Sequence, residues 1–492
     1  MYRSFLDFSM KDAERFIAVF DIGKSNKKFI LFSEDLKPSY LDYTRIDEVK
    51  IDGLICDDAE SIVSWMKSKL LYAARRWRIS ALSITTFGAT IANLKGGALR
   101  LPVVSYNQEV DRQIKEEFYE EFGSPLELYM STGTPPYGQL LNVGIQVYWI
   151  KKRFPEIFND IDEIMFLPQY LTYMLTGFKS SEITSIGCHT YLHDITKRGW
   201  SNVAKGLNVD FRLPKIYNVW EQLGEYEVGG SDIIVTPGIH DSNASLLPYI
   251  IKGEKVLLAS TGTWCVFMRP GEAFNPRNDD LYKDVLYYID AFGRPVRSSR
   301  FKGGFEYDYY TSIIRDKFLV NPENMSLDVN TLNNILRAGE DFIAPGLVEG
   351  SGQFQRSKAR IIGEAFNRSA KEAYHLLNLY LAVESYAAMS LITDLKNINV
   401  IIQGGFAKNN IYLSILSALL QKSRVFKTVF TEVTGLGAAI CAKCALEGAE
   451  PCDIGDEISS SITVEEVPKP EIDEEELWKY VDAFISKFSD NH

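Results

Sequence analysis

The sequence predicts an α/β protein with two large domains. Apolar runs typical of strands alternate with segments of helical spacing, the pattern of a parallel or mixed sheet with crossover helices. The chain has 492 residues, which is too long for a single hydrophobic core. Each half also begins with a strand, a glycine turn and a second strand, which indicates a weak internal duplication. We therefore expect domains at residues 1–245 and 246–492.

The first half opens with a group of expected strands, at residues 16–20, 28–32 and after the turn near Pro38. Apolar residues with helical spacing, including Ile62, Met66 and Leu70, then predict a helix over residues 59–76. Residues 81–85 are again typical of a strand. Further helices are expected at residues 109–122, 143–153 and 167–175.

The second half repeats this order of elements. A strand, turn and strand are expected over residues 256–268, and a long helix over residues 369–395. A short apolar strand at residues 400–403 ends in a glycine pair. Helices are expected after it, at residues 410–421, 436–446 and 476–488. The acidic segment 465–475 is interpreted as a solvated or loose connection rather than a binding element.

Composition excludes several classes of protein. The net charge of −12 argues against nucleic acid as the main partner, because phosphate backbones bind basic surfaces. No apolar run reaches the length that spans a membrane. Asp7 and Asp12 make the first residues unlike a secretory signal, and the six cysteines are sparse and scattered. A reduced, cytoplasmic protein is expected.

The turn at residues 21–26 (DIGKSN) follows the first strand and contains a carboxylate, a glycine and a lysine. Lys24 and the N–H groups of Ser25 and Asn26 are predicted to meet phosphate oxygens, and Asp21 to hold a hydrated metal ion. An ordinary hairpin turn with a polar tip is the alternative.

Two further turns offer similar chemistry. Thr261, Gly262 and Thr263 join two strands, and the glycine allows close approach of a phosphate while the hydroxyls donate to it. Gly404 and Gly405 follow a strand and precede a helix, where a flat ligand or a phosphate can lie against the backbone. Ordinary tight turns are the alternative in both places.

Asp241 is the candidate general base. It follows a glycine turn and stands between His240 and Ser242, with small residues after it. A Ser-His-Asp relay is disfavoured, because neighbours in sequence rarely face one another. A base for phosphoryl transfer need only accept a proton late, when the substrate oxygen already attacks. A helix-capping aspartate is the alternative interpretation.

These residues, in this order, resemble the FGGY family of carbohydrate kinases, part of the actin–Hsp70–hexokinase superfamily. The resemblance covers nearly the whole chain. Its motifs are residues 21–26 (DIGKSN), 85–88 (TTFG), 167–177 (LPQYLTYMLTG), 238–241 (GIHD), 260–264 (STGTW), 404–405 (GG) with Asn409, and 436–439 (LGAA). It implies two ribonuclease-H-like, actin-like ATPase domains with a cleft between them, and a sugar and ATP with Mg²⁺ as ligands.

The resemblance also implies roles for residues. Asp241 would be the base, Asp21 would support Mg²⁺, and Gly404, Gly405 and Asn409 would line the adenosine. The sugar site would be shaped by Thr86, Phe87, Gly88, Thr90 and His240. The motifs look most like L-fuculose and L-rhamnulose kinases, in which an aspartate that touches sugar hydroxyls stands where this chain has Thr90.

The expected function is therefore an ATP-dependent kinase that phosphorylates a hydroxyl of an L-fuculose- or L-rhamnulose-like ketose. A pentulose kinase acting on xylulose or ribulose is the alternative within this class. A catalytically weak regulator that senses sugar or nucleotide on the same fold is a second class, suggested by Thr90 and by a loop near Gly346 that lacks an arginine common in relatives. A chaperone-like or cytoskeletal ATPase is a remote third, and a homodimer is possible.

Overall fold

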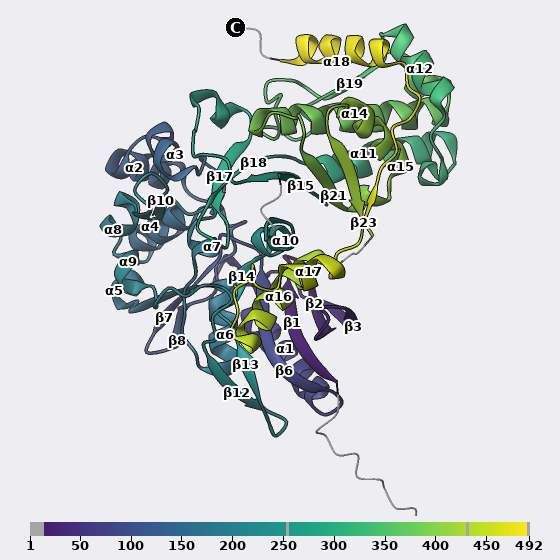
Figure 1. Ribbon diagram of the computed structural model, residues 1–492. Coiled ribbons are helices and arrows are strands. Elements are labelled where there is room, and N and C mark those ends of the chain that lie inside the picture. The colour runs from purple at the N-terminus through teal and green to yellow at the C-terminus, as the bar shows by residue number, and fades with distance from the viewer. Residues whose placement is uncertain (1–13, 252–254, 430–431, 490–492) are drawn as a thin grey trace, which may run out of the picture. The chain divides into compact units, whose positions relative to one another are not determined.

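The computed structural model describes residues 14–251, 255–429 and 432–489, so Asp7 and Asp12 lie outside it. The chain forms two compact units, each with a sheet and covering helices (Figure 1). Unit 1 contains the described residues up to 251 together with Ile289–Gly293 and Glu432–Ser461, and unit 2 contains the rest. The fold is thus mixed α/β in both units, as the alternation of apolar patterns predicts.

The main sheet of unit 1 has the strand order β12-β13-β6-β1-β2-β3, and β14 also pairs with β6. β1 is antiparallel to β2 and parallel to β6, which sets Asp21 opposite Lys28 on one side and Thr85 on the other. The strands are β1 (Arg15–Ile22), β2 (Asn26–Ser33), β3 (Pro38–Arg45), β6 (Arg78–Thr86), β12 (Gly224–Val228), β13 (Ser231–Val235) and β14 (Ile239–His240).

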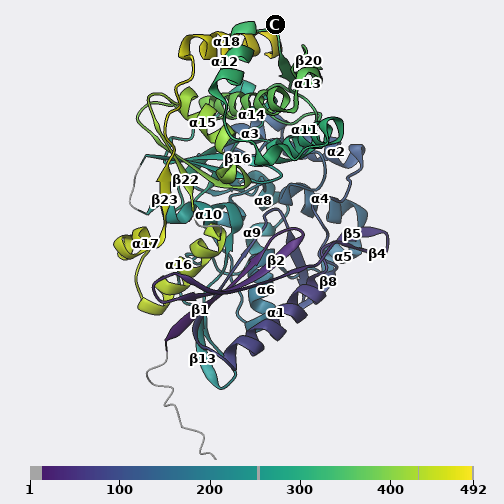
Figure 2. The same ribbon diagram turned by 90° about the vertical axis from the view of Figure 1, so that its right-hand side faces the viewer.

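Helices cover both faces of this sheet (Figure 2). On one face α1 (Ala59–Ala74) and α6 (Leu167–Thr176) share a buried apolar cluster with alternate residues of β1, β2 and β6. On the other face α16 (Val433–Glu447) packs on β1 and β6, and its Gly435 lies against Ile30 and Phe32 of β2. α10 (Asp241–Ile250) packs on α16. Nearly every residue of β1 and β2 is buried, because successive side chains face the two apolar layers in turn.

A second layer of unit 1 surrounds a small sheet of order β8-β7-β9 and has its own buried cluster. Its strands are β7 (Ile91–Lys95), β8 (Ala98–Leu101) and β9 (Glu163–Phe166). Its helices are α2 (Arg112–Phe122), α3 (Pro125–Thr132), α4 (Val143–Arg153), α5 (Pro155–Asp160), α8 (Asn202–Gly206) and α9 (Val209–Arg212). The remaining short elements are β4 (Val49–Ile51), β5 (Leu54–Cys56), α7 (Ile183–Ile186), β10 (His193–Asp194), β11 (Gly199–Trp200) and α17 (Gly455–Ser461).

The sheet of unit 2 has the order β17-β18-β16-β15-β21-β22-β23. Its strands are β15 (Val256–Thr261), β16 (Cys265–Pro270), β17 (Val285–Ile289), β18 (Pro295–Phe301), β21 (Asn399–Gly404), β22 (Arg424–Thr428) and β23 (Val464–Glu466). β15 is antiparallel to β16 and parallel to β21, so the turn after β15 and the glycine pair after β21 lie at the same end of the sheet.

Helices of unit 2 form one large apolar cluster with β15, β16 and β21. They are α11 (Gly303–Phe318), α12 (Val329–Ala338), α13 (Ala365–Arg368), α14 (Ala370–Ile392), α15 (Asn410–Leu419) and α18 (Glu474–Phe488). The shorter elements are the 3₁₀ helices η2 (Asn278–Tyr282), η3 (Pro322–Asn324) and η4 (Gly405–Lys408) and the strands β19 (Phe342–Ala344) and β20 (Arg360–Ile362).

Two expectations differ from the structure. The acidic segment 465–475 is not loose throughout, because β23 pairs with β22 and the side chains of Val467 and Ile472 are buried. α16, expected in the domain 246–492, groups with unit 1 because its small residues allow close packing on that unit's sheet and on α10. The carbonyl of Ala244 lies 1.9 Å from the position a Cβ of Gly437 would take.

Two carboxyl groups are buried in the core of unit 2. Glu306 on α11 accepts a hydrogen bond from the Tyr380 hydroxyl at 2.5 Å, and Glu384 lies on α14 with its Oε1 unpartnered. Burial raises the pKa of Glu306 to about 7, and burial together with the charge of Glu306 raises the pKa of Glu384 further. Both groups therefore enter the folded core more readily as acids than as carboxylates.

The substitution Glu306→Gln should flatten the dependence of stability on pH. The native state holds the Glu306 proton up to about pH 7, while the unfolded chain releases it near 4.5, so stability falls as pH rises between these values. Glu306 should contribute about 3 kcal/mol to this fall, at 1.36 kcal/mol per pKa unit. Urea unfolding at pH 5, 6, 7 and 8 measures it.

The matched control is Glu349→Gln, which removes an exposed carboxylate of the same unit. It should keep the wild-type slope. A Glu306→Gln variant that loses as much stability between pH 5 and pH 8 as wild type would show that Glu306 does not titrate in this range.

Candidate functional site

The carboxyl ends of β1, β6 and β14 bring Asp21 and Asp241 into one region of unit 1. Asp21 pairs with Thr85 of β6, and Ile239 of β14 pairs with the same threonine, so Asp241 begins α10 two residues after that strand position. The two carboxylates interact electrostatically. The sheet thus assembles two acidic residues that are 220 positions apart in the sequence.

Asp21 is buried and poorly compensated. Its one ion-pair partner among the described residues is Lys28, whose Nζ lies 3.7 Å from Oδ2 and 2.7 Å from Glu432 Oε2. Burial, opposed by Lys28 and reinforced by Asp241, raises the pKa of Asp21 to about 6. A cation bound at this carboxylate would offset that cost, which fits the expectation of a metal at Asp21.

Within the described ranges, no group of three or more histidine, cysteine, aspartate or glutamate side chains has the arrangement of a metal site. This is compatible with Mg²⁺, which is commonly held by one or two carboxylates together with substrate phosphates and water. The residues therefore fit a metal that arrives with a nucleotide, rather than a cage built by the protein alone.

The ammonium group of Lys24 is engaged by other side chains and is not free to bind a phosphate. Its Nζ lies 2.7 Å from Asp57 Oδ1 and 2.8 Å from Glu48 Oε1, and it donates to Ser105 Oγ at 2.9 Å. Three partners use its three N–H groups. The expectation that the Lys24 side chain meets phosphate is therefore corrected by its hydrogen bonds.

A different lysine, Lys27, stabilises the turn at residues 21–26. Lys27 is buried, and its Nζ donates to the carbonyl oxygens of Lys24 at 2.7 Å and of Ile46 at 2.8 Å. Burial lowers the pKa of Lys27 to about 8. Ser25 and Asn26 are exposed at the tip of the turn, so their N–H groups remain candidates for a phosphate.

Asp241 is the first residue of α10, where the helix dipole favours a negative charge. Its Oδ1 accepts hydrogen bonds from the backbone N–H of Ser242 at 2.6 Å and lies 3.2 Å from His240 Nε2. Oδ2 accepts no hydrogen bond from the described chain, and the side chain is 35% exposed. The N-cap of α10 is His240, so Asp241 is not the helix-capping residue, and its role as a base stays a prediction.

His240 is a buried neighbour of the predicted base. Burial, opposed by Asp241, lowers its pKa, so the ring is neutral at pH 7. Its Nδ1 lies 3.3 Å from Asn243 Nδ2, and a Cβ at Gly88 would come within 2.8 Å of its Nε2. Gly88 therefore allows the segment after β6 to pack on the histidine.

The other expected sugar-site residues follow β6. Phe87 is buried against the ring of Tyr106, with centroids 5.8 Å apart. The Thr86 hydroxyl donates to the carbonyl of Phe87, and the Thr90 hydroxyl to that of Gly88 at 3.4 Å. Thr90 is 1% exposed, so its hydroxyl is engaged inside the protein.

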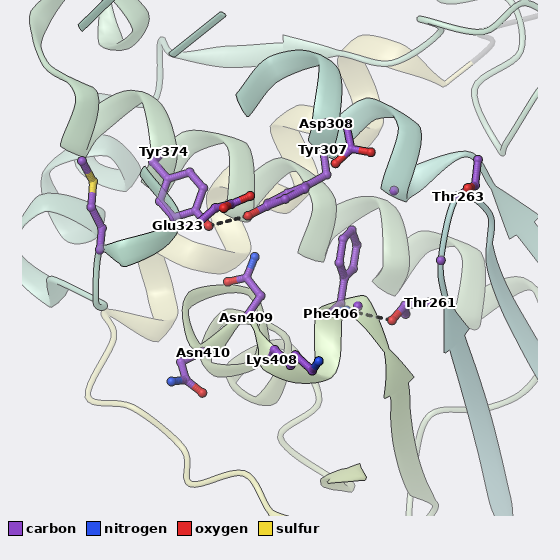
Figure 3. A pocket seen from close by; sticks show the side chains of 14 residues that line it. Thr261, Thr263, Tyr307, Asp308, Glu323, Tyr374, Phe406, Lys408, Asn409 and Asn410 are labelled. Atoms are coloured by element: carbon purple, nitrogen blue, oxygen red, sulfur yellow. Dashed lines mark hydrogen bonds between the residues drawn. The ribbon is translucent and has the colours of Figure 1, made fainter. Parts of the chain in front are cut away.

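Unit 2 contains a pocket of about 490 Å³ at the carboxyl ends of β15 and β21 (Figure 3). This volume is in the range of small-molecule sites. It is lined by Thr261, Gly262, Thr263, Gly304, Tyr307, Asp308, Glu323, Met325, Tyr374, Gly405, Phe406, Lys408, Asn409 and Asn410. The structure thus brings the two glycine turns of the second half to one cavity.

Aromatic rings and backbone share the walls of this pocket. The Tyr307 and Tyr374 hydroxyls are 2.7 Å apart, and the Tyr307 ring lies 5.6 Å from that of Phe406. Asn409 caps α15 through the N–H of Tyr412 and donates to Asn378. Flat apolar faces beside glycine backbone suit a planar base with a phosphate tail.

Thr261 serves the turn rather than a ligand. Its hydroxyl donates to the carbonyl of Gln403 at 2.5 Å and accepts from the N–H of Phe406 at 3.0 Å. The expectation that this hydroxyl donates to phosphate is therefore corrected. Thr263 is exposed on the pocket rim and keeps that predicted role.

Sequence reasoning missed several residues of both sites. In unit 1 these are Lys27, Lys28, Glu48, Asp57, Tyr106 and Glu432, and in unit 2 they are Tyr307, Tyr374, Phe406 and Lys408. Lys28 could have been found, because strand pairing across the first turn sets it opposite Asp21. The other residues lie on elements that are far apart in the sequence, and no local sequence pattern predicts that these elements come together.

Curated relatives are sugar kinases at low identity. A rhamnulokinase of Halalkalibacterium halodurans is 26% identical over 260 residues, which cover 50% of this chain and 54% of the relative. An L-fuculokinase of Haemophilus influenzae is 22% identical over 222 residues, covering 43% and 46%. The match thus spans about half the length of these relatives. No helix in the described part of the chain is both long and apolar enough to span a membrane.

Solved structures share the fold over nearly the whole chain. A carbohydrate kinase from Novosphingobium aromaticivorans has a TM-score of 0.82 at 24% identity, covering 97% of this chain and 98% of that one. Plasmodium falciparum glycerol kinase, solved with ADP, has a TM-score of 0.77 at 16% identity, covering 97% and 99%. At these identities the likeness establishes the two-domain α/β fold.

Two family models match in succession. The N-terminal domain of the FGGY family of carbohydrate kinases matches residues 16–247, and the C-terminal domain of carbohydrate kinase FGGY matches residues 253–451. Together they cover most of the 492 residues and contain both sites described above. The chain therefore belongs to the FGGY family of carbohydrate kinases.

Proposed function

We propose that the protein is an ATP-dependent kinase that phosphorylates a hydroxyl of a ketose. The observation that supports this most is the position of Asp241, a partly exposed carboxylate at a helix start beside the buried Asp21. Family membership and the named activities of the relatives, rhamnulokinase and L-fuculokinase, point to the same chemistry.

In this proposal Asp241 accepts the proton of the sugar hydroxyl as its oxygen attacks the terminal phosphorus of ATP. The bond from that phosphorus to the bridging oxygen breaks, and ADP leaves with the electron pair. The N–H of Ser242 donates a hydrogen bond to Asp241, and the start of α10 places the positive end of the helix dipole beside it. The free Oδ2 is the atom that takes the proton.

The nucleotide is proposed to occupy the pocket of unit 2. The base would lie among Tyr307, Tyr374 and Phe406, and the phosphates near the backbone of Gly262 and Gly405 and the Thr263 hydroxyl. Mg²⁺ bound with ATP would neutralise charge on the phosphates, and Asp21 would help to hold it. Lys28 would add a positive charge beside Asp21.

The substrate is proposed to be an L-rhamnulose- or L-fuculose-like ketose, with a pentulose as the alternative. A regulator that binds sugar without turnover is the second candidate, supported by Thr90 in place of a carboxylate. Against the regulator, Asp21 and Asp241 are both present and interact.

Sugar-dependent release of ADP tests the proposal. The panel is L-rhamnulose, L-fuculose, L-ribulose, D-xylulose and glycerol, each with ATP and Mg²⁺. We expect one ketose to stimulate ADP release well above the sugar-free rate. ATP binding without stimulation by any sugar would favour the regulator, and ATP hydrolysis indifferent to sugar would favour a different class of ATPase.

A further inference from the structure

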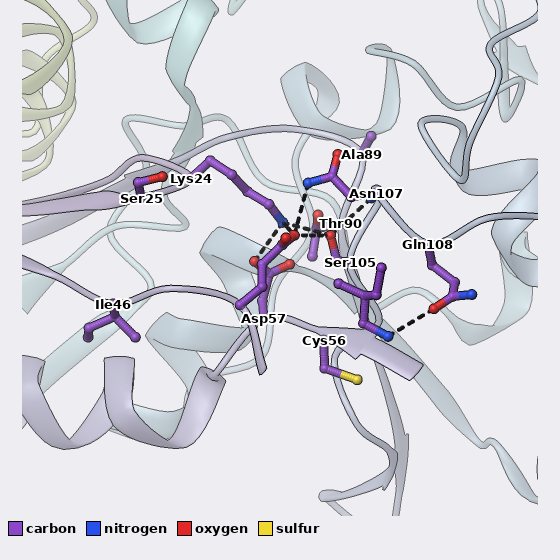
Figure 4. Close-up of polar contacts among 12 residues, drawn as sticks. Lys24, Ser25, Ile46, Cys56, Asp57, Ala89, Thr90, Ser105, Asn107 and Gln108 are labelled. Carbon is purple, nitrogen blue, oxygen red and sulfur yellow. Dashed lines mark hydrogen bonds and ion pairs between the residues drawn. The ribbon is translucent and has the colours of Figure 1, made fainter. Parts of the chain in front are cut away.

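Polar side chains, among them Asp57 and Ser105, gather around the ammonium group of Lys24 (Figure 4). Oε1 of Glu48 receives three donors, namely Lys24 Nζ at 2.8 Å, the Ser105 hydroxyl and Asn107 Nδ2 at 3.0 Å. Lys24 is itself anchored by Asp57, whose side chain is 3% exposed. The carboxylate of Glu48 is thus oriented by bonds to one of its two oxygens.

The other oxygen of Glu48 is available. No described residue donates to Oε2, and the side chain is 28% exposed. The pKa of Glu48 is lowered because the hydrogen bonds from Lys24, Ser105 and Asn107 outweigh the opposing effect of burial, which is the largest single contribution. Glu48 therefore presents an ionised, immobilised acceptor, the form that binds hydroxyl groups most strongly.

A second polar atom in the cluster is unsatisfied. Asp57 Oδ2 is buried and has no hydrogen-bond partner, although Oδ1 pairs with Lys24. A buried carboxylate oxygen without a donor costs free energy. A ligand hydroxyl would supply the missing donor, and a water molecule would supply it when no ligand is bound.

Tyr106 connects the cluster to the proposed catalytic carboxylate. Lys24 Nζ lies 4.3 Å from the centroid of the Tyr106 ring and 4.8 Å from that of Phe87, an expected sugar-site residue. Burial raises the pKa of Tyr106, and the charges of Asp241, Asp57 and Glu48 raise it further. Tyr106 therefore lies within electrostatic reach of both Asp241 and Glu48.

We propose that Glu48 determines sugar specificity by accepting hydrogen bonds from sugar hydroxyls remote from the phosphorylated one. Lys24 is the positioning residue that fixes it. Thr90, by contrast, is buried, and its hydroxyl donates to the carbonyl of Gly88. This inference rests on the proposed kinase function, because the ligand it assigns is the sugar of that reaction.

The substitution Glu48→Gln tests the inference in the full-length protein. It keeps the size of the side chain and leaves the Lys24–Asp57 pair in place. We expect KM for the active ketose to rise about 10- to 100-fold, the effect of losing hydrogen bonds to a charged acceptor. KM for ATP should stay within about twofold, since the pocket of unit 2 is untouched. Steady-state kinetics over the sugar panel measures both.

The matched control is Asp47→Asn, one residue away, where the carboxylate is exposed and pairs with Arg45. It removes the same charge and should leave both KM values unchanged. Melting temperatures of both variants separate misfolding from a binding effect. A deoxy analogue of the active ketose adds a second readout. Wild type should bind the analogue that lacks the recognised hydroxyl more weakly than the parent ketose. The Glu48→Gln variant should bind the analogue and the parent ketose equally well.

The outcomes separate the two proposals. If wild type turns over none of the sugars, the kinase proposal fails. If wild type turns over a ketose and Glu48→Gln has unchanged KM and the same order of preference among sugars, the kinase proposal stands and the role of Glu48 is wrong. A folded Glu48→Gln variant with a raised ketose KM and an unchanged ATP KM supports Glu48 as the specificity residue.

Discussion

Asp241→Asn should reduce kcat of the sugar-dependent reaction by about 10²- to 10⁴-fold, the range for loss of a general base. The amide keeps the hydrogen bond from the Ser242 N–H, so α10 and the position of the side chain should persist. It cannot take the hydroxyl proton, however. KM for ATP should change little, because the proposed nucleotide pocket lies in unit 2. Coupled detection of ADP measures the rates.

Asp232→Asn is the control for Asp241→Asn, because Asp232 is an exposed aspartate on β13 of the same unit. It should keep full activity. If Asp241→Asn retains more than half of the wild-type kcat while its melting temperature is unchanged, another group takes the proton. The neutral, buried His240 would then be the next candidate.

The fold was predictable because its elements have strong local signals. Apolar runs predicted β1, β2 and β15, and helical spacing predicted α1 and α14, all near their observed bounds. The strand β23 was missed, because Val464–Glu466 has two acidic residues in three positions. Its backbone pairing with β22 decides its structure, and such long-range pairing overrides local propensity.

The sequence singled out the turns at residues 261–263 and 404–405 by their glycine and hydroxyl residues. The structure places both turns at one pocket because β15 and β21 are parallel neighbours, a pairing that the sequence analysis did not predict. Lys24 was assigned incorrectly, because its partners Glu48 and Asp57 come from loops 24 and 33 residues away. No periodicity in the sequence predicts that Lys24, Glu48 and Asp57 lie together. The prediction for the Thr261 hydroxyl was wrong for a similar reason, since its partner Gln403 lies on another strand.

Gly404→Ala and Gly405→Ala should separate the backbone architecture of the proposed nucleotide pocket from its ability to bind ATP. Gly404 has a φ of 86°, and a Cβ there would lie 1.9 Å from the carbonyl oxygen of Thr261. The backbone oxygen is fixed by the β15–β21 ladder, so the strain cannot be relieved by a side-chain rotation. We expect Gly404→Ala to destabilise the protein by about 2 to 4 kcal/mol, from backbone strain and overpacking together. A urea unfolding curve measures this loss.

At Gly405 the nearest atom to an added Cβ is the same carbonyl oxygen at 3.8 Å, an ordinary contact. Gly405→Ala should therefore fold with the stability of wild type. Because Gly405 lines the pocket, its new methyl group should weaken ATP binding by about 1 to 3 kcal/mol, the cost of overpacking. Isothermal titration with ATP and Mg²⁺ gives the dissociation constant.

Gly339→Ala calibrates the pair, since Gly339 also has a positive φ of 63° but its nearest contact would be at 3.8 Å. It should cost only the backbone term, about 1 kcal/mol. A Gly404→Ala variant no less stable than Gly339→Ala would refute the close approach of β21 to Thr261. An unchanged ATP dissociation constant in Gly405→Ala would instead place the nucleotide outside this pocket. The two neighbouring glycines thus test different claims. Gly404 tests the close approach of β21 to β15, and Gly405 tests the proposed binding of ATP in the pocket.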